Sequence, residues 1–211
     1  MHAYQPRACR TYRVSVAPQV VPDLLGPDCS LHRLHLSSVE LYGTFTARFG
    51  NAAVCSTALR SLQLSTCGLR GPLPELRLPA LERLSLEFNH FKGGLEPLRN
   101  CTALKELQLH NNQLKGGLEP LQGCTALQEL RLSHNLLTGG LEPLRGCTAL
   151  RLLNLGSNRL SGEITPLRSC SALQELRLGG ASNHALVASD DDRAHFETQC
   201  GTMFTMLFSE W

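Results

Sequence analysis

A 23-residue spacing, kept by four residue types at once, constrains this chain more than any other feature. Asparagine, glycine, proline and cysteine each recur four times at this spacing between residues 89 and 170. The four series are Asn89, Asn112, Asn135 and Asn158; Gly93, Gly116, Gly139 and Gly162; Pro97, Pro120, Pro143 and Pro166; Cys101, Cys124, Cys147 and Cys170. A self-similar period of this length predicts a solenoid, in which one supersecondary unit is copied and stacked.

The residues of one unit, 104–126, show what each coil contains. Leu107 and Leu109 alternate with polar neighbours, which is the pattern of a half-buried strand, and copies of this strand should stack in parallel ~4.8 Å apart. The amide of Asn112 can donate and accept, so it can satisfy backbone groups at the turn that follows. Gly116 permits a tight or left-handed turn. Pro120 lacks an N–H, so we expect short helical or irregular turns on the return side.

The unit Leu-x-x-Leu-x-Leu-x-x-Asn-x-Leu resembles the leucine-rich repeat family. Close copies begin at Leu81, Leu104, Leu127 and Leu150. Looser copies begin at Leu31, Leu59 and Leu173, where Val39, Cys67 and Ala181 occupy the asparagine position. The resemblance covers roughly residues 31–180 and implies an α/β fold. That fold is a right-handed solenoid with parallel strands on its concave side and short helical or irregular turns on its convex side.

Both flanks of the repeats are predicted to cap the exposed apolar ends of the solenoid. Residues 1–30 form the expected N-terminal cap, in which alternation from Tyr12 to Val16 predicts an edge strand. Residues 181–211 form a C-terminal cap or, alternatively, a disordered tail. Apolar residues recur there at spacings of three and four, which predicts an amphipathic helix over the last coil. They are Phe196, Cys200, Met203, Phe204, Leu207, Phe208 and Trp211.

Nine cysteines raise the question of disulfides or a metal site, and their spacing argues against both. Cys101, Cys124, Cys147 and Cys170 share one slot of the repeat, so they should point inward as a ladder. Their Cβ vectors then run parallel and stay ~4.8 Å apart, which is longer than a disulfide prefers. No Cys-x-x-Cys pair is present for zinc. We therefore predict small buried thiols, which favour a reducing compartment.

Other candidate modification, metal and catalytic sites in the sequence also have a simpler structural explanation or are absent. Asn100-Cys101-Thr102 is an N-glycosylation sequon that becomes a possible modification site if the chain is secreted. The segment with His184, residues 190–192 (all Asp) and His195 could hold a cation, but it reads better as a solvated loop. No His-Glu-x-x-His, nucleophile elbow or phosphate loop is present. We expect no cofactor, no metal and no enzymatic activity.

Composition and charge narrow the classes of partner. The formal net charge is +2, whereas nucleic-acid-binding proteins usually show a strong basic excess on one face. The first ten residues lack an apolar core of a secretory signal, and no apolar run approaches the ~20 residues that span a bilayer. We therefore expect a cytoplasmic protein that binds neither nucleic acid, membrane nor a small-molecule substrate, and that is a monomer.

In such a solenoid, the outward residues of the strands form a continuous concave surface. This surface is polar and mixed in charge, so it could serve solubility alone, or it could bind a partner through arginine anchors. The predicted partner-binding residues are Arg83, Glu87, Phe88, Glu106, Gln108, His110, Glu129, Arg131, Ser133, Asn154 and Arg177.

Two functions from different classes fit this surface. The first is a non-catalytic, cytoplasmic protein–protein interaction module, a scaffold or regulatory adaptor. The second is an extracellular recognition fragment, because the stretch from Asn158 to Ile164 and residues 136–139 resemble plant-type leucine-rich repeats. That second resemblance implies likeness to receptor-kinase ectodomains or secreted inhibitors. The chain departs from that pattern where Leu-Glu-Pro replaces the expected Ile-Pro.

Overall fold

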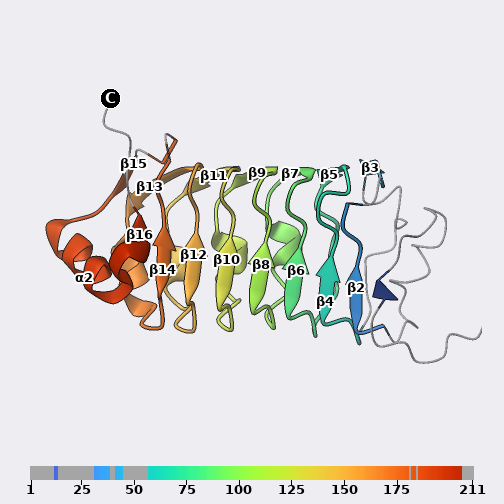
Figure 1. Ribbon diagram of the computed structural model, residues 1–211, viewed down its shortest axis with the longest axis horizontal. Helices are drawn as coiled ribbons and strands as arrows, with labels where there is room; N and C mark the ends of the chain where they lie inside the picture. Colours follow the sequence, from blue (N-terminus) through green and yellow to red (C-terminus); the bar gives the residue numbers. More distant parts are fainter. Residues whose placement is uncertain are drawn as a thin grey trace, which may run out of the picture.

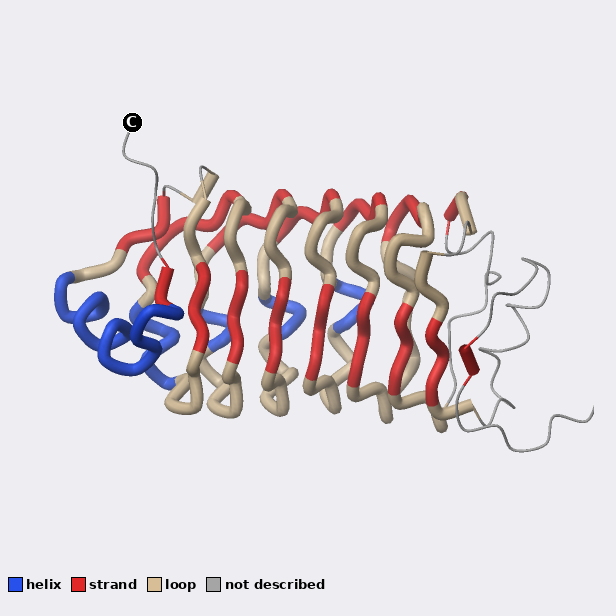
Figure 2. The backbone as a smooth tube through the Cα atoms, in the orientation of Figure 1, coloured by secondary structure: helices blue, strands red, loops and turns tan. Residues whose placement is uncertain are grey.

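The computed structural model shows a single solenoid whose coils lie side by side along the long axis of the molecule (Figure 1). The structure describes residues 12–13, 31–38, 41–44, 57–180, 182–183 and 185–205. Each of the seven coils between residues 31 and 187 contributes one strand to each of two parallel sheets, and Figure 2 shows these strands as two separate rows. The predicted fold class is confirmed.

The first sheet contains nine parallel strands, and we call it the concave sheet. In spatial order its strands are β1 (Tyr12–Arg13), β2 (Arg33–His35), β4 (Ser61–Gln63), β6 (Arg83–Ser85), β8 (Glu106–Gln108), β10 (Glu129–Arg131), β12 (Leu152–Asn154), β14 (Glu175–Arg177) and β16 (Phe204–Thr205). The edge strand expected in the N-terminal segment is present as β1, which pairs Tyr12 with Leu34. The rest of that expected strand, from residue 14 to Val16, lies outside the described residues.

A second sheet of seven parallel strands follows the turn after the concave sheet, and the sequence did not predict it. Its strands are β3 (Gly43–Thr44), β5 (Leu69–Pro72), β7 (His90–Gly93), β9 (Gln113–Gly116), β11 (Leu136–Gly139), β13 (Arg159–Glu163) and β15 (Ala185–Val187). Gly116, which we expected in a turn, ends β9 with a φ of +87°. Gly116 therefore adopts the left-handed backbone conformation that we expected, but as the last residue of a strand.

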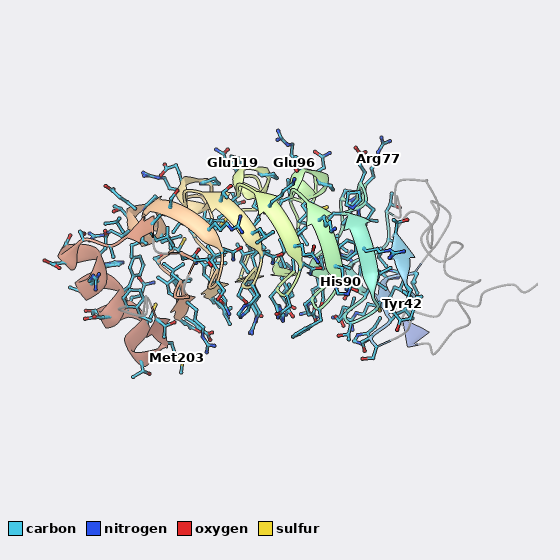
Figure 3. All side chains as sticks on the ribbon, turned by 90° about the horizontal axis from the view of Figure 1, so that it is seen from above. Tyr42, Arg77, His90, Glu96, Glu119 and Met203 are labelled. Atoms are coloured by element: carbon cyan, nitrogen blue, oxygen red, sulfur yellow. The ribbon has the colours of Figure 1, made fainter. Side chains whose placement is uncertain are left out.

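In four successive coils the remaining part contains a short 3-10 turn on the convex side, as predicted. These turns are η2 (Glu96–Leu98), η3 (Glu119–Leu121), η4 (Glu142–Leu144) and η5 (Thr165–Ser169). Proline occupies the first or second position of each, where its fixed φ suits a helix and its missing N–H costs nothing. Figure 3 shows Glu96 and Glu119 on this side of the solenoid and Tyr42 and His90 on the opposite side.

Leucines from successive coils form one continuous core between the two sheets and the convex turns. The central residue of each concave strand pairs in register with its counterpart in the next coil, for example Leu107 with Leu130. Both are fully buried. Each buried leucine contributes about 1.5–3 kcal/mol, so a single coil cannot offset the entropy of its own ordering and depends on its neighbours.

The repeated asparagines tie neighbouring coils together at the end of each concave strand. The Nδ2 of Asn158 donates to the carbonyls of Leu132 (2.9 Å) and Leu155 (3.0 Å), which lie in two successive coils. Its Oδ1 accepts from the backbone N–H of Leu137 at the start of β11 (3.1 Å). One buried side chain thereby satisfies three backbone groups and positions the second sheet, which confirms the predicted role of this residue type.

The asparagine ladder also continues one coil further than expected. We assigned Ala181 to the asparagine position of the last repeat, and Ala181 itself lies outside the described residues. Asn183 performs the role instead: it donates to the carbonyls of Leu155 (2.8 Å) and Leu178 (2.9 Å) and accepts from the N–H of Leu160 (3.0 Å). The predicted assignment was wrong because the last turn holds two additional residues. The spacing from Asn158 to Asn183 is therefore longer than the 23 residues between the earlier ladder asparagines.

The described cysteines are free and buried, as predicted for the ladder. They are Cys67, Cys101, Cys124, Cys147, Cys170 and Cys200. Each of the repeat cysteines directs its thiol to a backbone carbonyl of the preceding coil; Cys147 Sγ, for example, lies 3.6 Å from the carbonyl of Cys124. Cys67, in the asparagine position of its repeat, contacts the carbonyls of Leu36 and Ser65 in the same way.

A helix covers the last coil, but it begins earlier and ends sooner than predicted. Helix α2 (Asp190–Cys200) buries Phe196 and Cys200, and Gly201 is its C-cap residue. Gln199 fastens it by donating to the carbonyls of Cys170 and Leu173, both at 3.0 Å. Met203 lies in the 3-10 turn η6 (Gly201–Met203), and the next two residues form β16 and extend the concave sheet. The predicted residues Leu207, Phe208 and Trp211 lie outside the described residues.

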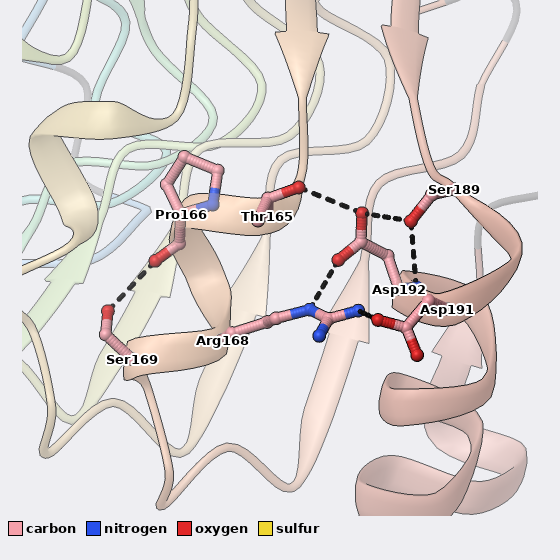
Figure 4. Close-up of polar contacts among 7 residues, drawn as sticks. All are labelled: Thr165, Pro166, Arg168, Ser169, Ser189, Asp191 and Asp192. Carbon is pink, nitrogen blue, oxygen red and sulfur yellow. Dashed lines mark hydrogen bonds and ion pairs between the residues drawn. The ribbon is translucent and has the colours of Figure 1, made fainter.

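The acidic segment that we expected to be a solvated loop is the first turn of α2, which overturns that expectation. Ser189 caps the helix, its Oγ accepting from the N–H of Asp192 (3.1 Å). The Asp192 carboxylate accepts from Arg168 Nε (2.6 Å) and Thr165 Oγ (2.9 Å), both in η5 (Figure 4). Three acidic residues at a helix N-terminus are favoured by the helix dipole, and two of them, Asp191 and Asp192, also pair with Arg168.

Candidate recognition surface on the concave sheet

The strand register places the predicted partner-binding residues in columns across the concave sheet. Arg83, Glu106 and Glu129 are successive neighbours in one column, which continues through Leu152 to Glu175. Gln108, Arg131, Asn154 and Arg177 form the adjacent column. Because the β-strand period is two, the outward residues of each strand all face the same surface.

Ion pairs within this surface neutralise most of its charges. Arg83 Nε lies 2.9 Å from Glu106 Oε1, and Arg177 Nε lies 2.8 Å from Glu175 Oε1. Arg131 Nε is 3.9 Å from Glu129 Oε2 and makes no hydrogen bond to the described residues. Arg131 therefore keeps a buried donor that a ligand could satisfy.

A shallow hollow of about 290 Å³ lies over the N-terminal half of the concave sheet. It is lined by His35, Ser37, Gln63, Ser65, Arg83, Leu84, Ser85, Glu87, Glu106 and Gln108. Three of the lining residues are serines, and Ser65 and Ser85 lie within hydrogen-bonding distance of each other at 3.2 Å. Ser85 also donates to the carboxylate of Glu87.

Phe88 lies beside this hollow and is the exposed aromatic residue of the surface. Its side chain is 54% exposed, and its ring meets the ring of His110 edge to face, with centroids 5.1 Å apart. Burial lowers the pKa of His110, and the charges of Arg131 and His134 add to this effect, while Glu87 opposes it. The imidazole is therefore neutral at neutral pH. Its Nδ1 is buried without a hydrogen-bond partner among the described residues.

The backbone of Phe88 is strained. Its φ is +54°, in the left-handed region, where a bulky residue is a true outlier. One residue per coil adopts this conformation directly before the ladder position, and the others are Ser38, Thr66, Asn111, His134 and Ser157. Polar residues such as Asn and His tolerate this region through local hydrogen bonds, but phenylalanine has no such compensation. Strain held at an exposed aromatic residue is typical of a functional position.

The structure brings only some of the predicted site residues together. Arg83, Glu87, Glu106 and Gln108 line the hollow, and Phe88 and His110 flank it. The other predicted residues lie further along the same sheet, and Ser133 among them is buried. They are Glu129, Arg131, Ser133, Asn154 and Arg177. The lining residues His35, Ser37, Gln63, Ser65 and Ser85 were left out of the predicted site, although the repeat register had placed them on the same surface.

Two further observations concern other kinds of site. Within the described part of the chain, no group of three or more His, Cys, Asp or Glu side chains could hold a metal ion. The cation site considered around residues 190–192 is occupied by protein contacts, since Asp191 and Asp192 both pair with Arg168. Among the described residues, no helix is long and apolar enough to cross a membrane.

A family model described as leucine-rich repeats (2 copies) matches residues 102–146 and 125–169 of this chain. No curated protein sequence matches it significantly. The likeness to solved structures is broader and extends across most of the solenoid.

The leucine-rich repeat ectodomain of the plant membrane receptor kinase GASSHO1/SCHENGEN3 from Arabidopsis thaliana, solved with CASPARIAN STRIP INTEGRITY FACTOR 2, is 31% identical. The match covers 71% of this chain and 21% of that one, with a TM-score of 0.61. A second similar structure is the Arabidopsis receptor kinase HAESA in complex with the peptide hormone IDA and the co-receptor SERK1, which is 25% identical. This match covers 79% of this chain and 32% of that one, with a TM-score of 0.62.

A plant ice-binding protein is similar as well, with 28% identity. That match covers 82% of this chain and 53% of the ice-binding protein, with a TM-score of 0.62. This chain therefore spans between about a fifth and about half of the length of these structures. The register of the two sheets, the asparagine ladder, the family model and the structural likeness agree. The chain is a leucine-rich repeat protein.

Proposed function

We propose that this protein is a non-catalytic recognition module, a scaffold or regulatory adaptor, that binds a peptide segment of another protein on its concave sheet. Leucine-rich repeat structures similar to it were solved with a peptide hormone or a factor bound, which supports a protein or peptide partner. The hollow beside β6 and β8 is the proposed centre of binding. An arginine, a neutral histidine and an exposed aromatic residue gather there, and such residues dominate binding energy at protein interfaces.

The observation that carries this proposal is the conformation of Phe88. The repeat sets a φ near +55° at this position of the coil, where a bulky side chain is strained, and Phe88 fills it with a ring that is 54% exposed. A bound partner would cover the ring and use the pre-set geometry. Arg83 and Glu87 on the hollow side would then select the polar groups of the partner. The flanking residues Glu129, Arg131, Asn154 and Arg177 would extend the contact along the sheet.

The experiment selects binding partners without assuming their identity. A random peptide library displayed on phage is selected against the immobilised wild-type chain, and the dissociation constants of selected peptides are measured for single variants. For Phe88→Ala we expect the affinity to fall by about thirtyfold, which corresponds to a hot-spot residue. Arg83→Ala should also lower the affinity for the same peptides, and the double variant Glu129→Ala/Arg131→Ala should lower it less.

Leu136→Ala is the matched control. Leu136 is also an exposed apolar residue, but it lies on β11 of the second sheet. Its substitution should leave the affinity of the selected peptides unchanged. Peptides that depend on Leu136 and are insensitive to Phe88 and Arg83 would contradict the proposal.

For the cellular location we propose the cytoplasm, supported by six described cysteines that are free and buried. Extracellular recognition is the second candidate, and the likeness to receptor-kinase ectodomains favours it. The sequon distinguishes the two, because Asn100 and Thr102 are both exposed while Cys101 between them is buried.

The test of location is the mass of the protein purified from its native tissue. A cytoplasmic protein keeps the same mass before and after treatment with peptide N-glycosidase F. A loss of mass on treatment, absent in an Asn100→Gln variant expressed in the same tissue, would identify the extracellular candidate instead.

A further inference from the structure

The second sheet carries cations that no described acidic residue neutralises. The four arginine and lysine residues on its strands are Arg70, Lys92, Lys115 and Arg159. None of them forms an ion pair with the part of the chain that the structure describes. In contrast, Arg83, Arg131 and Arg177 on the concave sheet each lie within 4.0 Å of a glutamate.

Three of these cations occupy equivalent positions in successive coils. Each directly follows a buried residue whose backbone N–H donates to a ladder asparagine; the buried residues are Leu69, Phe91 and Leu114. Arg70, Lys92 and Lys115 therefore occupy equivalent repeat positions on β5, β7 and β9, and all three are exposed. In the strand register each is offset by two residues from the next, since Arg70 pairs with His90 and Lys92 pairs with Gln113, so the three lie on a diagonal line across the sheet. We call this line the basic column.

A second hollow, of about 450 Å³, opens at the N-terminal end of the basic column. Tyr42, Gly43, Gly68, Arg70 and His90 line it. The Tyr42 side chain is 58% exposed. A Cβ atom on Gly68 would lie 2.6 Å from Cδ1 of Tyr42, and Gly68 has a φ of +65°, so only glycine allows the ring to lie there. Tyr42 and His90 face the same side of the molecule (Figure 3).

We propose that the basic column and the Tyr42 hollow bind an acidic polysaccharide, a linear chain of sugars that carry carboxylate or sulfate groups; this ligand goes with the extracellular candidate for the location. Cations repeated along one line match anionic groups repeated along a linear chain. An exposed aromatic ring at the end of the line offers a flat apolar face with a negative quadrupole, which suits the C–H bonds of a sugar ring. A single narrow line does not present the broad basic surface that an anionic membrane requires.

Two other polyanions fit this surface less well. An acidic peptide gains affinity by adding a strand to a free sheet edge, but β5, β7 and β9 are each paired on both sides. A single-stranded nucleic acid stacks successive bases on several aromatic side chains, whereas Tyr42 is the one aromatic residue that lines this hollow. A polysaccharide needs neither a free edge nor a row of aromatic rings.

Binding of the full chain to alginate, which carries carboxylates, and to dextran sulfate tests the proposal, with neutral dextran as the reference. Titration calorimetry at low ionic strength should detect binding to an acidic polysaccharide and none to dextran. The double variant Lys92→Gln/Lys115→Gln should lose about tenfold or more in affinity, and the slope of log affinity against log salt should become shallower by about one per cation. Tyr42→Ala should weaken binding without changing that slope.

The matched control is the double variant Arg151→Gln/Arg193→Gln, which removes two positive charges as well. Arg151 directly precedes β12, Arg193 lies in α2, and both are exposed. It should bind the polysaccharides like the wild type. Phe88→Ala should also bind them normally, so this proposal and the proposed function of the concave sheet fail or succeed separately. Equal losses in the two double variants, or tighter binding of poly-glutamate, single-stranded DNA or anionic lipid vesicles, would overturn the proposal.

Discussion

Arg168 Nε and Asp192 Oδ1 lie 2.6 Å apart and join the last convex turn to the capping helix. The Asp192 side chain is only 3% exposed, and hydroxyl groups of Thr165 and Ser189 satisfy its other oxygen. Because a terminal coil of a solenoid has a neighbour on one side only, this contact closes the apolar core where the repeats end.

The Asp192 contact should make the cap sensitive to acid. Burial raises the pKa of Asp192, but hydrogen bonds from Ser189, Arg168 and Thr165 outweigh it and hold the pKa below its usual value. A carboxyl group with a lowered pKa stabilises the folded state fully above its unfolded value of ~3.9 and loses this contribution as pH falls through the folded value. NMR signals of α2 should therefore broaden or shift to unfolded positions below about pH 4, before those of the central repeats.

The variant Asp192→Asn should loosen the same helix at pH 7, at a cost of about 1–3 kcal/mol. Asp190→Asn, a control in the same helical turn whose side chain is exposed, should leave the cap in place. Helix signals that persist in Asp192→Asn, or that vanish equally in Asp190→Asn, would show that this ion pair does not hold the cap.

Loss of a ladder asparagine should destabilise the solenoid strongly. Asn158→Ala leaves the carbonyls of Leu132 and Leu155 and the N–H of Leu137 without their partner. Each buried group left unsatisfied costs about 1–3 kcal/mol. Urea denaturation should show this loss, and Asn183→Ala should produce a similar but more local effect at the C-terminal end.

Asn154→Ala is the control for the ladder, since its side chain bonds only within its own coil, to the N–H of Gly156 at 3.2 Å. It should change the free energy of unfolding by less than about 1 kcal/mol. If Asn183→Ala behaved like Asn154→Ala, the assignment of Asn183 to the ladder would be incorrect.

The repeat allowed the concave sheet, the core and the ladder to be predicted because these features share one spacing. The prediction failed where the spacing changed: Asn158 and Asn183 are 183 − 158 = 25 residues apart, and the last rung was therefore placed at Ala181. A backbone turn can absorb two additional residues while the side-chain position it presents stays the same, and sequence spacing does not reveal this.

The second sheet could not be predicted from local pattern. β9 has a single buried side chain, Leu114, and polar or glycine neighbours, which is too short an alternation to identify a strand. Its position depends on Asn135 of the next coil, which accepts from the Leu114 N–H at 3.0 Å. The stabilising contact is non-local, so the sheet, and with it the basic column, emerges only in the stacked structure.

The candidate site was partly accessible from sequence for the same reasons. The register identified Arg83, Glu106 and Gln108 as outward-facing, and the structure places them at one hollow. The left-handed backbone of Phe88 and the unpartnered Nδ1 of His110 are tertiary properties. The one available signal was the residue type at the position before the ladder asparagine, where Asn111, His134 and Ser157 are polar and Phe88 is not.

The thiol ladder should be unreactive in the native protein. Burial raises the pKa of Cys101 to about 11 and that of Cys147 to about 12, and neighbouring thiols add to the shift. Alkylation by iodoacetamide at pH 8, followed by mass spectrometry, should modify these cysteines more than about a hundredfold faster in urea than in the native state. Rapid native labelling of Cys147 would show that the core is open.

The same thiols should make the protein sensitive to alkali. A thiol whose pKa is raised by folding contributes stability that is complete below its unfolded pKa of ~8.5 and is lost as pH rises toward the folded value. The urea midpoint should therefore fall between pH 8 and pH 10. Cys147→Ala should show a smaller fall, because it has no thiol to ionise at that position.

Two phenylalanines three residues apart should respond to substitution in opposite ways. Phe91 is fully buried, and Phe91→Ala should cost about 3–5 kcal/mol. Phe88→Asn removes a ring pair worth about 0.5–1.5 kcal/mol and relieves a left-handed strain of about 1–2 kcal/mol, so it should stay within about 1 kcal/mol of the wild type. Thermal unfolding measures both. A large loss of stability in Phe88→Asn would assign this side chain to the core and remove the reason to place it in a binding site.

Site-specific photo-cross-linking tests the role of the concave sheet most directly. A benzophenone amino acid is introduced at Phe88 or, as the control, at Leu136, and each protein is irradiated with the selected peptides or in an extract of its native tissue. We predict one reproducible cross-linked partner from position 88 and none from position 136, with the cross-link suppressed by Arg83→Ala. Equal labelling from both positions, or a cross-link that only position 136 forms, would contradict recognition on the concave sheet.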